Sequence, residues 1–158
     1  MKAISATNKR YSTIPRYSLK LVKEKGIRYP ADKVYDSKTA ELVCRAYLET
    51  CDCEHLIMLM IDGQNNMVGL HTIAIGGVAG LSTSARDIMK HAIAGNAFAI
   101  ILAHNHPSGN VRPSEQDIIF TNVVKSAGLM MGIPLVDHII ISSGIVEGSF
   151  SFMNNGIL

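Results

Sequence analysis

The sequence predicts an α/β (α+β) fold in which a single mixed β-sheet is flanked by helices. Short, almost wholly apolar runs of strand length, such as residues 55–61, alternate along the chain with segments whose apolar residues recur at helical spacing. Hydrophobic residues make up 47% of the 158 residues, which is typical of a packed globular chain and not of a disordered one. Strands interleaved with single helices indicate one sheet covered by helices.

Residues 1–34 are predicted to form a basic extension, and residues 35–158 the folded domain. Between residues 2 and 28 the chain carries eight lysines and arginines but a single acid, Glu24, whereas the formal net charge of the whole chain is only +2. A solvated extension is the main interpretation, and weak nucleic-acid contact is the alternative. One short strand is expected within it, at residues 17–22.

The domain is expected to begin with a helix and a hairpin. Asp36 or Ser37 can cap a helix that continues to about Thr50. The helical period then ends, and residues 55–61 and 67–75 are expected to pair as an antiparallel hairpin around a turn of Asp, Gly and Asn.

A glycine-containing loop separates this hairpin from a second helix. One of the three hydroxyl residues at 82–84 is expected to cap a helix over residues 85–94. The sequence Gly95-Asn96 predicts that this helix ends in a left-handed conformation. A buried strand is expected next, at residues 98–103.

The last elements are a third helix and two strands. Ser114 is expected to cap the helix, which continues to about Ala127, before Gly128. Strands are then predicted at residues 136–142 and 146–152, with a Ser-Gly turn between them.

The candidate metal-binding and catalytic residues cluster in one segment, AHNHPSGNVRPSEQD, residues 103–117. His104 and His106 occupy alternate positions, so in extended backbone they point the same way, at the carboxyl end of a buried strand. Asp117 lies on the first turn of the next helix, on the same face as Ser114. Two imidazoles and one carboxylate leave an open coordination position, as in a catalytic zinc site. Zinc in such a site lowers the pKa of a water molecule to about 7 and polarises a carbonyl.

This segment resembles the signature of the JAMM (MPN-plus) metallohydrolases, a distant Glu followed by H-[ST]-H-P-x6-S-x-x-D. Each residue alone would be a loop histidine or a helix cap, but the combined spacing is far more specific. The wording AHNHPSG, with Asn105 in the middle position, is similar to the bacterial RadC-like branch, as are LIMLMIDGQNNMVG, SARDIMKHA and VDHIII. The resemblance covers residues 35–158 and implies a JAMM/MPN sandwich of cytidine-deaminase-like fold. RadC proteins usually carry a helix-hairpin-helix segment ahead of this domain, and residues 1–34 do not show its pattern.

The resemblance implies a role for each residue of the motif. His104, His106 and Asp117 would hold one zinc ion. Glu54 would take a proton from the metal-activated water and pass it to the leaving nitrogen. Ser114 would donate a hydrogen bond to the developing oxyanion.

Two points of this assignment stay open. Glu41 and Glu49 are rivals of Glu54, although both fall within the predicted first helix, and Glu54 could be a surface acid at a strand edge. Asn105 replaces the Ser or Thr of the protease members, which leaves the class of substrate open.

Other residues that could bind a metal or react have simpler structural interpretations. His138, beside Asp137, is either a partner behind the metal ligands or a satisfied strand histidine. Cys51 and Cys53 do not have the CxxC spacing of a zinc ribbon or a thioredoxin site. The methionines at 130–131, if exposed, could support a homodimer. The odd cysteine count and the lack of an apolar leader predict a cytoplasmic chain with reduced thiols.

Three functions are compatible with the sequence. The first is a zinc-dependent hydrolase of a peptide, isopeptide or related amide bond. The second is a DNA-associated accessory protein, acting in DNA repair or a mobile element, in which the metal site is not used for proteolysis; the basic N-terminus is its only support. The third is an inactive scaffold, and the intact motif argues against it.

Overall fold

The computed structural model describes residues 13–18, 21–26, 28–29, 33–76, 83–143 and 148–158. Within these residues the chain forms one mixed five-stranded sheet and three helices, as the sequence predicts. The elements are α1 (Ser37–Leu48), β1 (His55–Ile61), β2 (Met67–Ile75), α2 (Ala85–Ala94), β3 (Ala99–His106), α3 (Glu115–Met131), β4 (Leu135–Ser142) and β5 (Ser149–Ser151).

The strand order β2-β1-β3-β4-β5 places β3 at the centre of the sheet. β1 pairs antiparallel with β2, which confirms the predicted hairpin, and antiparallel with β3. β3 runs parallel to β4, and β5 returns antiparallel to β4. A parallel pair needs a crossover connection, and α3 supplies it.

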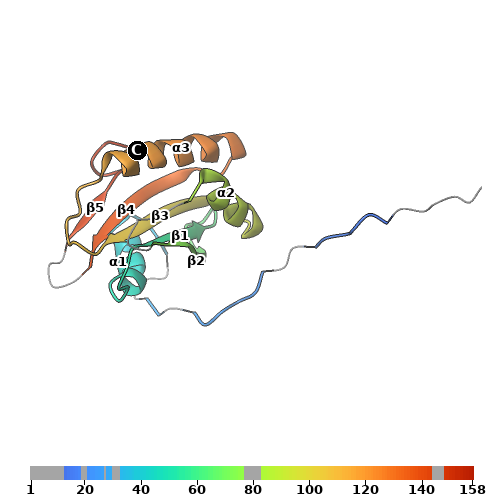
Figure 1. Ribbon diagram of the computed structural model, residues 1–158, viewed down its shortest axis with the longest axis horizontal. Helices are drawn as coiled ribbons and strands as arrows, with labels where there is room; N and C mark the ends of the chain where they lie inside the picture. The colour runs from blue at the N-terminus through green and yellow to red at the C-terminus, as the bar shows by residue number, and fades with distance from the viewer. Residues whose placement is uncertain (1–12, 19–20, 27, 30–32, 77–82, 144–147) are drawn as a thin grey trace, which may run out of the picture.

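The sheet separates two apolar layers. α1 covers one face, and α2 and α3 cover the other (Figure 1). Ile57 of β1 and Ile101 of β3 pack in the layer that contains α1, whereas Met58 and Leu102 pack with α2 and α3. Side chains alternate along a strand, so even-numbered residues of β1 and β3 face α2 and α3.

The helix starts agree with the sequence. Asp36 caps α1 by accepting a hydrogen bond from Thr39 N at 2.7 Å, and Ser84 caps α2. α1 ends at Leu48, two residues before the predicted Thr50. After α2 the left-handed residue is Asn96, with φ 53°.

α3 is longer than the sequence predicts. The expected end at Ala127 was wrong, because the helix continues through Gly128 to Met131. Gly128 is buried where the chain turns back, and a Cβ at this position would lie 2.5 Å from the backbone oxygen of Ile133. Glycine is needed here for close packing, and the left-handed Gly132, with φ 69°, ends the helix.

Three predicted strands need correction. β3 begins at Ala99 and continues to His106, so both histidines of the motif lie within it. β5 covers only Ser149–Ser151 of the expected range, of which residues 146–147 lie outside the described chain. Of the short strand expected at 17–22, the described residues 17, 18, 21 and 22 are not in a strand.

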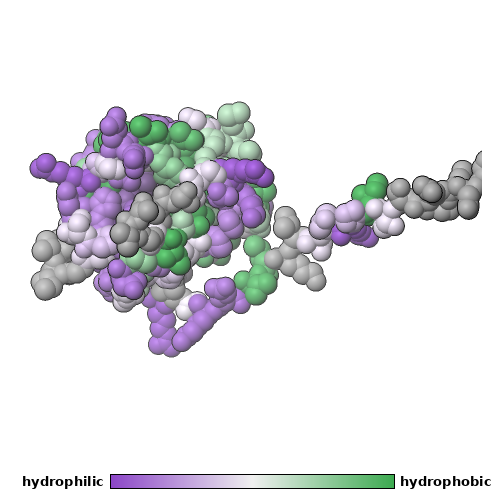
Figure 2. All heavy atoms as spheres, in the orientation of Figure 1, coloured by the Kyte–Doolittle hydropathy of each residue, from purple (hydrophilic) through white to green (hydrophobic). Residues whose placement is uncertain are grey.

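The surface carries two features of note. Figure 2 shows hydrophobic side chains over α3 at the top of the view; the exposed ones of this helix are Ile119, Val123, Leu129, Met130 and Met131. Residues 13–18 of the basic extension lie away from the domain (Figure 1), whereas residues 21–26 and Tyr29 line a hollow together with residues of β2 and α2. No helix in the described part of the chain is long and apolar enough to cross a membrane.

Candidate metal centre

Two histidines of β3 and one aspartate of α3 converge at the carboxyl end of β3. His104 Nε2 lies 3.0 Å from His106 Nε2 and 3.4 Å from Asp117 Oδ1, and His106 Nε2 lies 3.8 Å from Asp117 Oδ2. Both histidines are even-numbered residues of β3 and therefore face α3, whose first turn presents Asp117. The structure thus brings the three predicted ligands together.

The spacing of these atoms fits a zinc ion. A tetrahedral ion with ligand bonds of about 2.0–2.1 Å holds neighbouring ligand atoms about 3.3 Å apart. The separations of 3.0, 3.4 and 3.8 Å lie on either side of this value. Two imidazole nitrogens and a carboxylate oxygen form a donor set that zinc accepts, with a fourth position left for water or substrate.

A loop contact fixes the tautomer of His106. Its Nδ1 lies 2.5 Å from the carbonyl oxygen of Asn110, which can only accept, so Nδ1 carries the proton and Nε2 keeps a lone pair. The turn that returns Asn110 to His106 contains Gly109, whose φ of 79° suits glycine. The loop therefore holds His106 in the form that can bind a metal.

A chain of buried hydrogen bonds fixes the tautomer of His104. The hydroxyl of Thr121 donates to the backbone oxygen of Asp117 at 2.6 Å, so its oxygen must accept from His138 Nδ1, also at 2.6 Å. His138 Nε2 is then the acceptor for the Nδ1 proton of His104 at 2.8 Å. This order of protons leaves His104 Nε2 with a lone pair that faces Asp117.

Burial keeps both of these histidines neutral at pH 7. His104 and His138 are 2% and 1% exposed. Desolvation lowers the pKa of His104 to about 4, although Asp117 acts in the opposite direction. Desolvation, together with the neighbouring histidines, lowers the pKa of His138 well below its ordinary value. Neutral imidazole is the form that ligates metals.

Glu54 lies immediately before β1, on the same face of the sheet as the histidines. Its carboxylate and one ring nitrogen of each of His104 and His106 all lie within 4.8 Å of one another. Burial raises the pKa of Glu54, which nearby Asp117 also favours and His106 opposes. A half-buried carboxylate with a raised pKa is a stronger base than an exposed one.

The hydroxyl group of Ser114 makes two hydrogen bonds within the first turn of α3, both to Asp117. Its oxygen accepts from Asp117 N at 3.1 Å, and its proton is donated to Asp117 Oδ2 at 2.6 Å. The backbone N–H of Ser114 donates to the same carboxylate oxygen at 2.7 Å. This capping box orients Asp117, so an oxyanion role requires the hydroxyl proton to leave the carboxylate.

The sequence did not identify Thr121 or the carbonyl of Asn110 as part of the site. One signal was present for Thr121, which lies four residues after Asp117 on the same face of a predicted helix. The carbonyl of Asn110 carries no side-chain signal. His138 is a buried strand histidine with hydrogen-bond partners, but one of these partners is His104, a predicted metal ligand.

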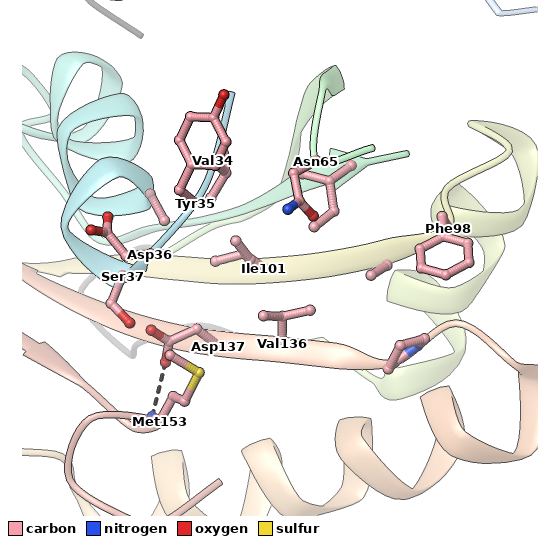
Figure 3. Close-up of a pocket in the computed structure, with 14 residues that line it drawn as sticks. Val34, Tyr35, Asp36, Ser37, Asn65, Phe98, Ile101, Val136, Asp137 and Met153 are labelled. Atoms are coloured by element: carbon pink, nitrogen blue, oxygen red, sulfur yellow. Dashed lines mark hydrogen bonds between the residues drawn. The ribbon is translucent and has the colours of Figure 1, made fainter. Parts of the chain in front are cut away.

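A cavity of about 330 Å³ lies on the other face of the sheet, near the start of α1 (Figure 3). Its lining is largely apolar and includes Ile101, Val136 and Phe98. The one buried acid there, Asp137, already accepts hydrogen bonds from Met153 N at 3.0 Å and Ser151 Oγ at 2.7 Å. The cavity therefore does not belong to the metal centre.

The remaining histidines and cysteines lie apart from it. His71 of β2 and His91 of α2 stack on each other, with ring centroids 4.0 Å apart. Cys51 and Cys53 are unpaired half-buried thiols. Among the described residues, the groups that could hold a metal ion gather around His104 and His106, with Glu54 and Asp117 beside them.

Comparison with known proteins yields a family and a set of relatives. A family model described as RadC-like JAB domain matches residues 34–157. A UPF0758 protein of Lactococcus lactis subsp. lactis is 38% identical over 125 residues, which cover 79% of this chain and 54% of the relative. A UPF0758 protein of Porphyromonas gingivalis is 38% identical over 128 residues, covering 80% and 55%. The chain thus spans about half the length of these curated relatives.

Proposed function

Because the chain belongs to the family of RadC-like JAB domains, we propose that it is a zinc-dependent hydrolase of a peptide, isopeptide or related amide bond. The observation that carries this proposal is the convergence of His104, His106 and Asp117, with Glu54 beside the two histidines. A structural zinc site would use a fourth protein ligand, whereas this arrangement leaves a position for water and a carboxylate to act on it.

The chemistry divides between the metal and the chain. Zinc bound here would lower the pKa of a water molecule and polarise the scissile carbonyl. Glu54 accepts the proton that the attacking water loses and delivers it to the nitrogen as the amine departs. The raised pKa of Glu54 favours both halves of this transfer, since the group must take up a proton and release it.

Ser114 is proposed to assist by donating to the developing oxyanion. Its proton faces Asp117 Oδ2 in this structure. Binding of a cation at that carboxylate would weaken the attraction of Asp117 for the proton, which frees the hydroxyl to rotate toward a substrate. Its lone pairs still accept from Asp117 N and continue to cap α3.

The first experiment measures zinc and hydrolysis in three proteins. The wild-type protein should contain about one zinc ion per chain, and His106→Ala should lose most of it. Glu54→Gln should keep zinc and the fold, but kcat should fall by about 10²–10⁴-fold, because a neutral amide cannot accept the water's proton. The probes are internally quenched peptides and peptides branched through a lysine ε-amide.

Two results would contradict the proposal. Full zinc content in His106→Ala would remove the ligand assignment. Cleavage by Glu54→Gln at the wild-type rate would show that another group is the base. Glu49→Gln is the matched control, since Glu49 lies at the end of α1 and should be replaceable without loss of rate.

Nucleic-acid contact through the basic extension is a second proposal. Arg16, Lys23, Lys25 and Arg28 are exposed, and Tyr17 is 87% exposed among them. Cations that neutralise phosphates give salt-dependent affinity, to which exposed aromatic rings add base stacking. Deletion of residues 1–28 should abolish salt-dependent binding of a single-stranded oligonucleotide and leave zinc content unchanged. Equal binding by the truncated protein would rule the extension out.

A further inference from the structure

Asn105 lies between the two histidines of β3 but faces the opposite side of the sheet. Its side chain is completely buried on the side of α1. The primary amide contacts the backbone of the segment that carries Glu54: Oδ1 accepts from His55 N at 2.7 Å, and Nδ2 donates to Cys53 O at 2.9 Å. The two backbone groups belong to the residues immediately before and after Glu54.

This amide continues the sheet where the backbone ladder stops. The pairing of β1 with β3 ends at Leu56 and His104, one residue short of the Asn105 level. Beyond that pair, the side chain of Asn105 offers one donor and one acceptor to the neighbouring chain, as a peptide group would. On the other side, Gly76 N donates to the carbonyl oxygen of Glu54 at 2.7 Å. The backbone at Glu54 is therefore held from both sides.

Of residues with the length of this side chain, asparagine alone supplies the hydrogen bonds that the site needs. Aspartate has no donor and would place a carboxylate against the carbonyl oxygen of Cys53. Serine and threonine have one hydroxyl proton and a shorter reach, so at least one of the two backbone groups would lose its partner. Leaving a buried backbone group unpaired is costly.

We propose that Asn105 is a positioning residue that holds Glu54 at the distance from the histidine ligands at which it can act as the base. The inference rests on the proposed hydrolase function. It also gives a physical reason for an amide at the middle position of the His-x-His motif. The strand thereby uses both faces for one purpose: His104 and His106 hold the metal, and Asn105 holds the base.

The test combines Asn105→Ser with a matched control. Asn105 Nδ2 also donates to Ser143 Oγ at 2.9 Å, so Ser143→Ala removes a bond of the same amide without touching the Glu54 segment. Asn105→Ser should keep zinc and KM but lower kcat by about 10²-fold, because small displacements of a catalytic group have effects of this size. Ser143→Ala should stay within about two-fold of the wild-type protein in kcat.

Two further readouts separate positioning from a general loss of structure. In Glu54→Gln, which lacks the base, adding Asn105→Ser should not lower the residual rate further, because the two residues act as a unit. Hydrogen exchange of the His55 amide, followed by NMR in the zinc-loaded protein, should accelerate about tenfold in Asn105→Ser and not in Ser143→Ala. Asn105→Thr replaces Asn105→Ser if the latter unfolds at the assay temperature.

The outcomes distinguish this inference from the function on which it rests. If the wild-type protein cleaves no probe, the hydrolase proposal fails. The positioning role is tested separately: an unchanged rate of hydrogen exchange at the His55 amide in Asn105→Ser would overturn it. If hydrolysis is observed and Asn105→Ser lowers the rate equally in the wild-type and Glu54→Gln backgrounds, Asn105 does not act through Glu54. Loss of zinc in Asn105→Ser would equally overturn the assignment.

Discussion

At the scale of single residues, His138 supports the candidate metal centre without being one of its predicted ligands. It contacts His104 through one ring nitrogen and Thr121 through the other, and Phe152 stacks on its ring with centroids 4.9 Å apart. The ring is therefore fixed in plane and in proton order. A partner of this kind orients a metal ligand and makes it more basic.

We expect His138→Phe to weaken zinc binding by about 10–100-fold. Phenylalanine keeps the volume and the stacking on Phe152 but cannot accept the Nδ1 proton of His104. Competition with a chromophoric chelator gives the zinc affinity. His71→Phe, a histidine outside the site, is the control and should bind zinc as the wild-type protein does. An unchanged affinity in His138→Phe would make the contact with His104 irrelevant to the metal.

The sequence could single out the three candidate ligands because they lie in one stretch. His104, His106 and Asp117 are related by strand alternation and by the start of a helix, both of which are local rules. The contacts of His138 and Asn105 join positions 17 to 52 residues apart in sequence. No local period encodes such pairs, so the residues that His138 and Asn105 contact could be identified only from the order of the strands in the sheet.

At the scale of elements, the start of α3 serves both the fold and the site. Ser114 caps the helix with its oxygen and orients Asp117 with its proton. We expect Ser114→Ala to reduce the free energy of unfolding by about 0.5–2 kcal/mol. It should also lower turnover by roughly 10²–10³-fold if the hydroxyl donates to the oxyanion.

Melting temperature, zinc content and turnover should be measured together for this variant. Ser84→Ala, which removes the corresponding capping box of α2, is the control for the effect on stability alone. A Ser114→Ala protein that melts early but turns over normally would leave Ser114 a helix cap. One that loses zinc would show that its main task is to orient Asp117.

The end of the same helix shows where local rules fail. Gly128 has the appearance of a helix stop, yet it lies inside α3, because only a residue without a Cβ fits beside the backbone of Ile133. β1, β2 and α2 were predicted with their observed bounds, since each has a clear period and a turn or cap at its ends. Tertiary packing, and not the apolar period, therefore decides where α3 ends.

At the scale of the whole molecule, acid should destabilise the metal-free protein. The pKa of His104 is about 4 when folded, against 6.5 ordinarily, and that of His138 is also lowered. The unfolded chain therefore binds protons as the pH falls through 6.5, before the folded protein does. The stability contributed by the neutral histidines is present above pH 6.5 and is lost progressively toward pH 4.

Thermal unfolding in a chelator between pH 7.5 and 4.5 tests this expectation. The melting temperature should fall over that range, and the fall should be smaller in His138→Phe, which has one buried histidine fewer. A melting temperature that is independent of pH from 6.5 to 5 in the wild-type protein would contradict it.

The alternation along β3 also limits how the length of this chain can change during evolution. Inserting one residue within 99–103 would turn both histidines toward α1 and bring Asn105 to the side of Asp117. Inserting two would restore the faces but displace the histidines by about 6.6 Å along the strand, away from Glu54. Across relatives, we therefore expect neither gaps nor insertions within this strand.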